Sequence, residues 1–196
     1  MDVQKTIRNL QLRGYSVRYF ETAAEAADYL NAEIQNTAVG IGGCMTAQEL
    51  GLFDSLSKNN EVYWHWKAPG PETIARANAA PVYITSANAM TEDGEILNID
   101  GRGNRLAGQV YGNKKLYIIA GTNKICPDFS SALERARNVA AVKNGKRFPA
   151  QTPCKLDDKC HDCRSADKIC RALLVLWAPM MGMEAEVVLI GEELGY

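Results

Sequence analysis

The chain has 196 residues, a length that favours a single domain spanning residues 1–196. With 46% hydrophobic and 23% charged residues it can form a packed core, which excludes an intrinsically disordered protein. The 22 Lys and Arg residues nearly balance the 23 Asp and Glu residues, and a net charge of -1 argues against an extended nucleic-acid-binding surface.

Segments with strand and helix patterns alternate along the chain. Runs rich in β-branched, aromatic or leucine residues predict strands at residues 16–20, 38–41, 61–64, 82–85, 116–120, 172–177 and 186–190. Apolar residues recur at helical spacing at Val3, Ile7 and Leu10, at Ala23, Ala26, Ala27, Leu30 and Ile34, and at Phe129, Leu133, Ala136 and Ala140. Several strands are almost continuously apolar, which predicts that both of their faces are covered.

This alternation predicts an α/β fold in which helices flank a mainly parallel sheet. Thr22 with Glu25, and Thr46 with Glu49, have the spacing of capping boxes at helix N-termini. Residues 141–170 lack an apolar period, and we expect them to form a Cys-rich flap on the main domain. The last two strands, joined by the sequence PMMGMEA, are expected to form a β-hairpin.

A glycine-bearing loop follows the strand predicted at residues 38–41. Glycines let backbone N–H groups approach a ligand, and the start of the next helix favours an anion. The candidate ligand-binding residues here are Gly40, Gly42, Gly43, Cys44 and Thr46. The loop lacks the later glycine of a dinucleotide-binding fingerprint, and a plain tight turn is the alternative.

Cys44 lies at the mouth of this loop. A helix N-terminus would lower the pKa of its thiol and make a thiolate nucleophile possible. No base accompanies it in sequence, since the chain has two histidines, His65 and His161. A small packed residue is therefore the alternative that we favour for Cys44.

A second polar loop follows the strand predicted at residues 82–85. The carboxyl ends of parallel strands are where α/β sheets bind ligands, so this loop should lie beside the first one. Its candidate ligand-binding residues are Ser86, Asn88, Asn98, Asp100, Gly101, Gly103, Asn104 and Arg105, with Arg105 as a bidentate partner for a carboxylate or phosphate. The alternative is that the Asp and Gly residues only shape turns, as the sequence Glu92-Asp93-Gly94 before a short strand also indicates.

Four cysteines crowd into the flap, and their spacing predicts a metal site. They follow the pattern C-x5-C-x2-C-x6-C at Cys154, Cys160, Cys163 and Cys170. A C-x2-C pair directs two thiolates at one soft cation, and two flanking cysteines complete four ligands for an iron–sulfur cluster or zinc. His161 could replace one cysteine, and disulfides or free thiols are the remaining alternatives.

The aromatic sequence Trp64-His65-Trp66 could stack against a flat ligand ring. Alternation along a strand places both Trp side chains on one face, which packing of the core also requires. We favour core packing for this segment.

Several motifs together resemble the LUD, or lactate-utilisation, domain family. They are GIGGCMTAQELGL, TSANAMTEDGEILNIDGRGNRLAG, GTNKI, ALERARNVAA, the TPC…CHDC…IC run and VVLIGEELGY. The resemblance covers nearly the whole chain and implies a fold similar to ribose-5-phosphate isomerase and the CoA transferases. It also implies a bacterial cytoplasmic protein that takes part in lactate oxidation beside iron–sulfur oxidoreductase subunits.

The same stretch is distantly similar to the sugar-phosphate isomerases related to translation initiation factor 2B. Their pattern places a catalytic Asp where this chain has Asn88, and an amide cannot abstract a proton as a carboxylate does. A CoA-transferase reading needs a carboxylate nucleophile, for which Glu92 and Glu95 are the catalytic candidates.

The sequence therefore leads to three hypotheses. The first is an accessory or ligand-binding subunit in lactate oxidation that holds a small anion, such as a carboxylate, a sugar phosphate or a CoA-like molecule. The second is an acyl- or CoA-transferase, and the third is a non-catalytic interaction protein stapled by its metal. The longest apolar run, residues 172–178, is too short to span a bilayer, and the first ten residues have no signal-peptide core, so we expect a cytoplasmic protein without a membrane span.

Overall fold

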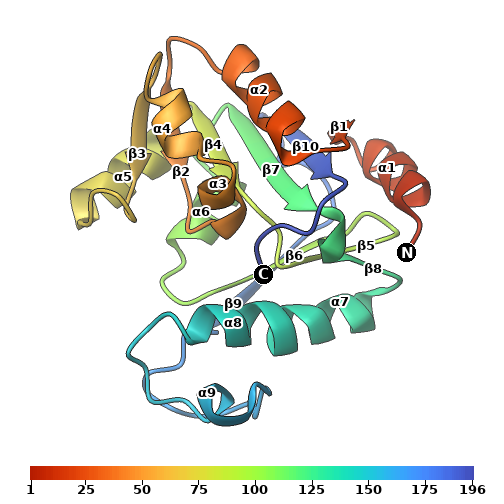
Figure 1. The fold of residues 1–196 in the computed structure, drawn as a ribbon, viewed down its shortest axis with the longest axis vertical. Helices are drawn as coiled ribbons and strands as arrows, with labels where there is room; N and C mark the ends of the chain where they lie inside the picture. Colours follow the sequence, from red (N-terminus) through yellow and green to blue (C-terminus); the bar gives the residue numbers. More distant parts are fainter.

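The computed structural model describes residues 1–196 and contains two β-sheets packed face to face (Figure 1). The larger sheet has six strands, and every neighbouring pair in it is parallel. In spatial order its strands are β1 (Ser16–Phe20), β10 (Glu184–Ile190), β7 (Lys115–Gly121), β4 (Val82–Thr85), β2 (Ala38–Ile41) and β3 (Glu61–Trp64). The prediction of an α/β fold with a mainly parallel sheet is confirmed.

The smaller sheet has four strands and mixed direction. In spatial order they are β8 (Ile125–Cys126), β5 (Ala89–Thr91), β6 (Ile96–Asp100) and β9 (Ala172–Leu176). Strand β6 is antiparallel to both of its neighbours, whereas β5 and β8 are parallel. The predicted turn at Glu92-Asp93-Gly94 connects β5 to β6.

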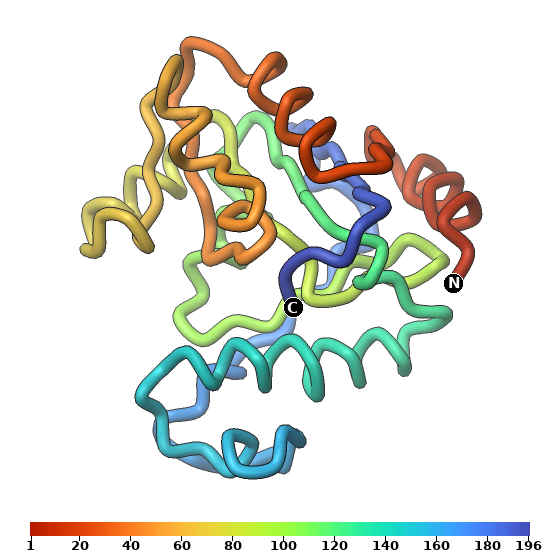
Figure 2. The backbone as a smooth tube through the Cα atoms, viewed as in Figure 1, coloured from red at the N-terminus to blue at the C-terminus, as the bar shows by residue number.

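Helices cover the outer faces of both sheets. The helices before the smaller sheet are α1 (Val3–Leu12), α2 (Ala23–Glu33), α3 (Met45–Glu49), α4 (Leu52–Leu56) and α5 (Pro71–Ala79). The later ones are α6 (Asn104–Val110), the 3-10 turn η1 (Thr122–Lys124), α7 (Phe129–Arg135), the π-turn η2 (Ala136–Ala140), α8 (Ala141–Gly145) and α9 (Cys154–Asp157). The segments α7, η2 and α8 follow one another without a break and form one long helix (Figure 2).

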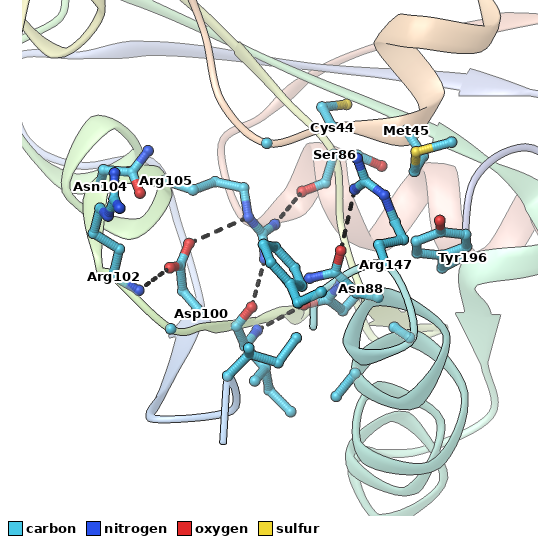
Figure 3. A pocket seen from close by; sticks show the side chains of 18 of the residues that line it. Cys44, Met45, Ser86, Asn88, Asp100, Arg102, Asn104, Arg105, Arg147 and Tyr196 are labelled. Atoms are coloured by element: carbon cyan, nitrogen blue, oxygen red, sulfur yellow. Dashed lines mark hydrogen bonds and ion pairs between the residues drawn. The ribbon is translucent and has the colours of Figure 1, made fainter. Parts of the chain in front are cut away.

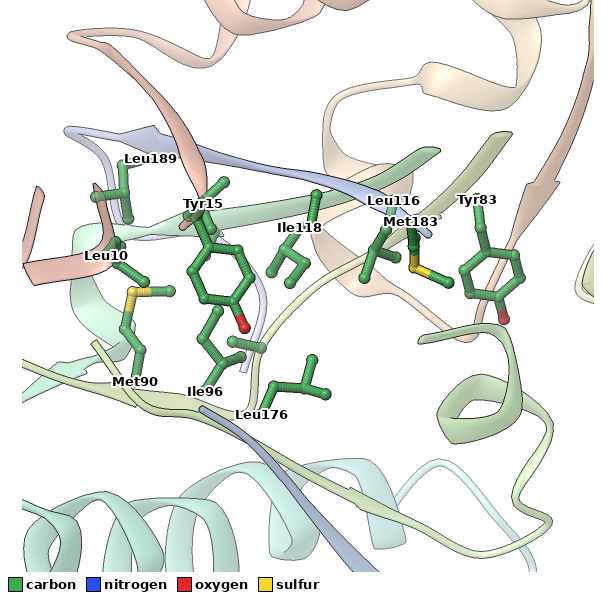
Figure 4. Packing of buried hydrophobic residues seen from close by; sticks show 14 of the residues in the cluster. Leu10, Tyr15, Tyr83, Met90, Ile96, Leu116, Ile118, Leu176, Met183 and Leu189 are labelled. Atoms are coloured by element: carbon green, nitrogen blue, oxygen red, sulfur yellow. The ribbon is translucent and has the colours of Figure 1, made fainter. Parts of the chain in front are cut away.

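Strand β7 shows how the core is divided into layers. Its residues Leu116 and Ile118 face the smaller sheet, where they pack with Ile96 and Leu176 (Figure 4). The alternate residues of β7 face the other way, toward α2, α3 and α4. Because the central strands are buried on both faces, their sequences are apolar almost without interruption, as predicted.

The long helix lies on the outer face of the smaller sheet. Ala132 and Ala136 pack there against Ala89 and Leu97. The resulting order of layers is helices, large sheet, small sheet and long helix, and α9 lies below that helix in Figure 1, on its side away from the sheets. None of the helices has both the length and the apolar content needed to cross a lipid bilayer.

One of the two predicted capping boxes is confirmed. The Thr22 hydroxyl accepts from the backbone N–H of Glu25, and the Glu25 carboxylate accepts from the N–H of Thr22. The box at Thr46 and Glu49 was wrong, because α3 begins two residues earlier than that pattern requires. Cys44 is its N-cap residue, and the Cys44 Sγ atom accepts from the N–H of Ala47 at 3.3 Å.

The predicted β-hairpin of the last two strands was also wrong. Strand β9 is an edge strand of the smaller sheet, whereas β10 lies inside the larger sheet between β1 and β7. Residues 177–183 therefore carry the chain from one sheet to the other. The burial of β10 explains the difference, since a strand with buried side chains on both faces is stabilised between two parallel neighbours. The flap is shorter than predicted, because residues 141–145 belong to the long helix.

The close packing of β2 against α5 makes Gly40 essential for stability. A Cβ atom at Gly40 would lie 2.0 Å from the backbone oxygen of Ala77, whereas one at Gly43 would come no closer than 3.4 Å to the Trp66 ring. We therefore expect Gly40→Ala to lower the free energy of unfolding. The loss should be near the upper end of the range of roughly 1–3 kcal/mol that overpacking costs. Urea unfolding checks this, with Gly43→Ala as the matched control, and equal stability of the two variants would contradict it.

Candidate functional site

A cavity of about 480 Å³ opens at the carboxyl edge of the larger sheet (Figure 3). The residues that follow β2, β3, β4, β7 and β10 contribute to it, namely 43–46, 65–66, 86–88, 124 and 196. Residues 99–102, 104 and 105, the end of the long helix and part of the flap complete the wall. The cavity lies where ligands bind in open α/β sheets and has the size of a small-molecule site.

The two polar loops predicted from the sequence meet in this cavity. From the candidate residues, its wall includes Gly43, Cys44, Thr46, Ser86, Asn88, Asp100, Gly101, Asn104 and Arg105. Gly40, Gly42, Asn98 and Gly103 do not line it. Gly40 packs against α5, and Gly42 contacts the side chains of Tyr83 and Arg105 from behind the wall. Gly103 is the N-cap of α6 and has a φ of 88°, a left-handed conformation that glycine favours.

The Arg105 side chain joins the loop after β4 to strand β6. The residue is 8% exposed, and its guanidinium group uses Nε, Nη1 and Nη2 within the protein. The acceptors are Asn98 Oδ1 at 2.5 Å, Ile99 O at 2.6 Å, Asn88 Oδ1 at 3.1 Å, Ser86 O at 3.4 Å and Asp100 Oδ2 at 3.5 Å. Figure 3 shows the side chain reaching between these groups. Since these five interactions use its donors, Arg105 positions the loops and has no free pair of N–H groups for an anion.

Asp100 has a similar role. Its Oδ1 atom accepts from the backbone N–H groups of Arg102 and Gly103, each at 2.9 Å, and its Oδ2 atom pairs with Arg105. The carboxylate therefore shapes the turn before α6, in line with the simpler alternative weighed for this loop. Asn98 is fully buried, and its side-chain Nδ2 donates to Gln109 Oε1 at 2.7 Å, so it also supports the wall from behind.

The charged side chains around the cavity are mostly basic. The six basic residues are Arg102, Arg105, Lys124, Arg147, Lys168 and Arg171, and the two acidic ones are Asp100 and Asp167. Asp100 is paired with Arg105, and Asp167 accepts from the backbone N–H of Gln151 at 3.0 Å. The remaining positive charge favours an anionic ligand.

Lys124 is the basic group that sequence reasoning missed. It follows β7 in η1, is 2% exposed, and its amine makes no hydrogen bond or ion pair within the protein. Burial, with a further contribution from the positive charge of Arg135, lowers the pKa of Lys124 to about 7. The signal in the sequence was a lysine just after a buried strand, at the edge where the two recognised loops were already expected.

Backbone donors lie at the same end of the cavity. No group within the protein accepts from the N–H groups of the four consecutive residues 43–46, all of which line the cavity. The Cβ position of Gly195 would be 3.3 Å from both Lys124 Nζ and Thr46 N, so these two nitrogens are neighbours. The hydroxyls of Thr46 and Ser86 are 3.2 Å apart beside them.

Cys44 is not an activated thiol. It is buried, and burial raises its pKa to about 11 although the N–H of Ala47 donates to its sulfur. The lowered pKa expected from its position was wrong, because α3 has only five residues and desolvation of the thiolate outweighs its field. The alternative of a small packed residue fits its place in the core.

The aromatic segment divides between the core and the cavity. Trp64 is buried in the core, as favoured, and its ring stacks on Trp66 with 5.2 Å between the centroids. Trp66 and His65 line the cavity, and the Arg147 guanidinium lies 4.0 Å from the centre of the Trp66 ring. Burial, with the nearby charge of Arg102, lowers the pKa of His65 below its usual range.

A model of the LUD domain matches residues 3–190. The chain belongs to the LUD, or lactate-utilisation, domain family. Among solved structures, it is similar to a DUF162 family protein from Deinococcus radiodurans. The two are 14% identical, the match covers 96% of each chain, and the TM-score is 0.59, which shows a shared fold. No curated protein matches the chain.

The LUD domain keeps the two candidate nucleophiles Glu92 and Glu95 away from its cavity. Glu92 accepts from the backbone N–H of Asp2 at 2.9 Å and pairs with Lys5 Nζ at 3.3 Å, and these contacts lower its pKa. The Glu95 carboxylate accepts from the Thr91 hydroxyl at 3.4 Å in the turn between β5 and β6. Neither lines the cavity, so the geometry gives no support to a transferase nucleophile at these positions.

All four flap cysteines of the LUD domain line a second cavity of about 350 Å³. The two cavities share Ile99, Ala141, Lys168, Ile169 and Arg171 as wall residues. Cys44 and Cys126 lie elsewhere, buried in two different clusters of the core.

The Arg105 network predicts a loss of stability when its geometry is changed but its charge is kept. Arg105→Lys leaves several buried acceptors unpaired, including Asn98 Oδ1. Each unpaired acceptor should lower the stability of the folded protein by roughly 1–3 kcal/mol. We expect a clear drop in the urea midpoint. Arg102→Lys is the matched control, since the Arg102 side chain is exposed and makes no hydrogen bond within the protein. Equal midpoints for the two variants would show that the network is dispensable.

Proposed function

We propose that this LUD domain binds a small organic anion, carrying a carboxylate or phosphate group, in the cavity at the carboxyl edge of its larger sheet. It would act as a ligand-binding or accessory subunit in the oxidation of lactate to pyruvate, together with iron–sulfur oxidoreductase subunits. The observation that carries the proposal is the amine of Lys124, which is buried at the cavity wall without an acidic partner. Burying an amine costs free energy, and an anion beside it would offset that cost.

The proposed binding mode places the anionic group at the inner end of the cavity. There the Lys124 amine, the N–H groups of residues 43–46 and the hydroxyls of Thr46 and Ser86 would donate to its oxygens. Hydrogen bonds between charged groups are stronger than those between neutral groups, so a small number of them can hold a ligand of few atoms. Arg102 and Arg147 also line the cavity, where they would attract the anion or hold a second acidic group.

The transferase alternative has weaker support. A transferase nucleophile would have to be a carboxylate in the cavity, and the two there, Asp100 and Asp167, both accept hydrogen bonds within the protein. The third alternative, a non-catalytic interaction protein whose metal only staples the flap, gives no reason for a buried amine at Lys124. We therefore retain anion binding as the proposed function.

Replacing Lys124 tests this function directly. We expect Lys124→Met to weaken binding about tenfold or more, since a hydrogen bond to a charged group contributes about 1.5–3 kcal/mol. Titration calorimetry with lactate, pyruvate, inorganic phosphate and coenzyme A compares the four classes of anion. Lys58→Met is the matched control, because Lys58 is exposed and lies outside the cavity.

The same variant should be more stable than the wild type in the absence of ligand. Met fills the site without an amine that burial penalises, so we expect a higher melting temperature for Lys124→Met. A variant that is both more stable and unable to bind anions separates a binding defect from misfolding. If Lys124→Met binds every anion of the panel as tightly as the wild type, the proposal is wrong.

The lowered pKa of Lys124 predicts the pH dependence of binding. Below about 7 the amine is protonated and attracts an anion, and above that pH it becomes neutral in the free protein. For lactate, whose own charge is constant here, we expect affinity to fall by up to about tenfold per pH unit as the pH rises above 7. Calorimetry between pH 6 and 9 checks this, and Lys124→Met should lose the dependence. A wild-type affinity that rises with pH would contradict the assignment.

A further inference from the structure

We propose that Cys154, Cys160, Cys163 and Cys170 bind a 4Fe–4S cluster in the flap cavity. The four thiols come from separate places in the chain. Cys154 begins α9, Cys160 and Cys163 lie in the loop after it, and Cys170 lies just before β9. All four nevertheless line one cavity, and all are free thiols. A fold that directs four unpaired thiols at one space provides the ligand set of such a cluster.

The placement of the four cysteines around one cavity favours a cluster over a single ion. Zinc binds sulfur at about 2.3 Å, so four cysteines around one zinc ion must almost touch. No group of three or more His, Cys, Asp and Glu side chains is arranged to hold one metal ion. The four cysteines line a cavity of about 350 Å³, a space that suits a larger inorganic core.

Apolar residues form much of the remaining wall of this cavity. Ile99, Leu133, Val142, Ile169 and Leu173 are among them. An apolar shell limits the access of water and thereby influences the stability and potential of a cluster.

His161 also lines the flap cavity. Its Nε2 atom lies 2.9 Å from both carboxylate oxygens of Asp157, an interaction that lowers the pKa of Asp157 and leaves only Nδ1 of the ring for a bond to a metal.

The long helix supports the flap. Arg137 Nη2 lies 3.6 Å from Cys160 Sγ, and the Asn138 side-chain oxygen accepts from the N–H of Cys160 at 2.8 Å. A cation beside the sulfur would offset the negative charge of thiolate-bound iron.

The cluster site adjoins the anion cavity but does not depend on it. Lys168 and Arg171 line both cavities, and Ile169 separates them. A cluster in the flap would therefore lie next to the bound anion. A metal that only stabilised the flap would not need this position. Loss of anion binding would leave the cluster proposal intact, and the reverse also holds.

The test begins with the wild-type chain, purified without oxygen and reconstituted with ferrous iron, sulfide and a thiol reductant. We expect a brown protein with iron and acid-labile sulfide in equal amounts, and Mössbauer spectra of tetrahedral iron with sulfur ligands. Reduction with dithionite should produce the EPR signal of a reduced 4Fe–4S cluster. A colourless protein that binds one zinc ion per chain under the same conditions would overturn the proposal.

Cysteine variants assign the ligands. We expect Cys160→Ala and Cys163→Ala each to lose most of the iron and sulfide. Cys126→Ala, which changes a buried cysteine outside the flap, should keep the wild-type content. The flap lies outside both sheets, so circular dichroism should show an unchanged core in all three. A full iron and sulfide content after replacement of all four flap cysteines would also overturn the assignment.

Discussion

Burial of the larger sheet on both faces constrains every other part of this molecule. Its central strands β7 and β10 contact the smaller sheet on one side and helices α2 to α4 on the other, so they have no exposed face on which polar groups could act. Polar groups that can contact a ligand are therefore confined to the ends of the strands. The loops at the carboxyl edge carry the polar and basic groups, and Arg105 fixes the loop after β4 to strand β6 through five acceptors. The cavity is thus preorganised by the same layers that stabilise the fold.

Lys124 shows what such preorganisation costs. A lysine that is 2% exposed and has no acidic partner lowers the stability of the ligand-free protein, and the layers around it must offset that loss. Functional sites often contain groups that are unfavourable for folding alone. Membership of the LUD domain family relates the protein to lactate utilisation.

The sequence predicted the larger sheet well because its strands have a strong and simple signal. Four of the seven predicted strands have the observed bounds, and the others differ by one or two residues at an end. The smaller sheet was largely missed, because β5 and β8 have three and two residues and are too short for a periodic pattern. The false hairpin followed from the same omission, since β9 had no visible partner in sequence until β6 was known.

The sequence indicated which loops line the cavity better than it indicated what each side chain does there. The two loops share a cavity as expected, yet Arg105 is used internally and Cys44 is an inert packed thiol, because both roles depend on burial, which the sequence does not show. The long helix then has a consequence for how the two cavities behave. Its residues Ala140 and Asn144 line the cavity at the sheet edge, Arg137 and Asn138 contact Cys160, and Ala132 packs against the smaller sheet. One helix therefore forms part of the wall of both cavities, so a displacement of this helix would change the shape of both together.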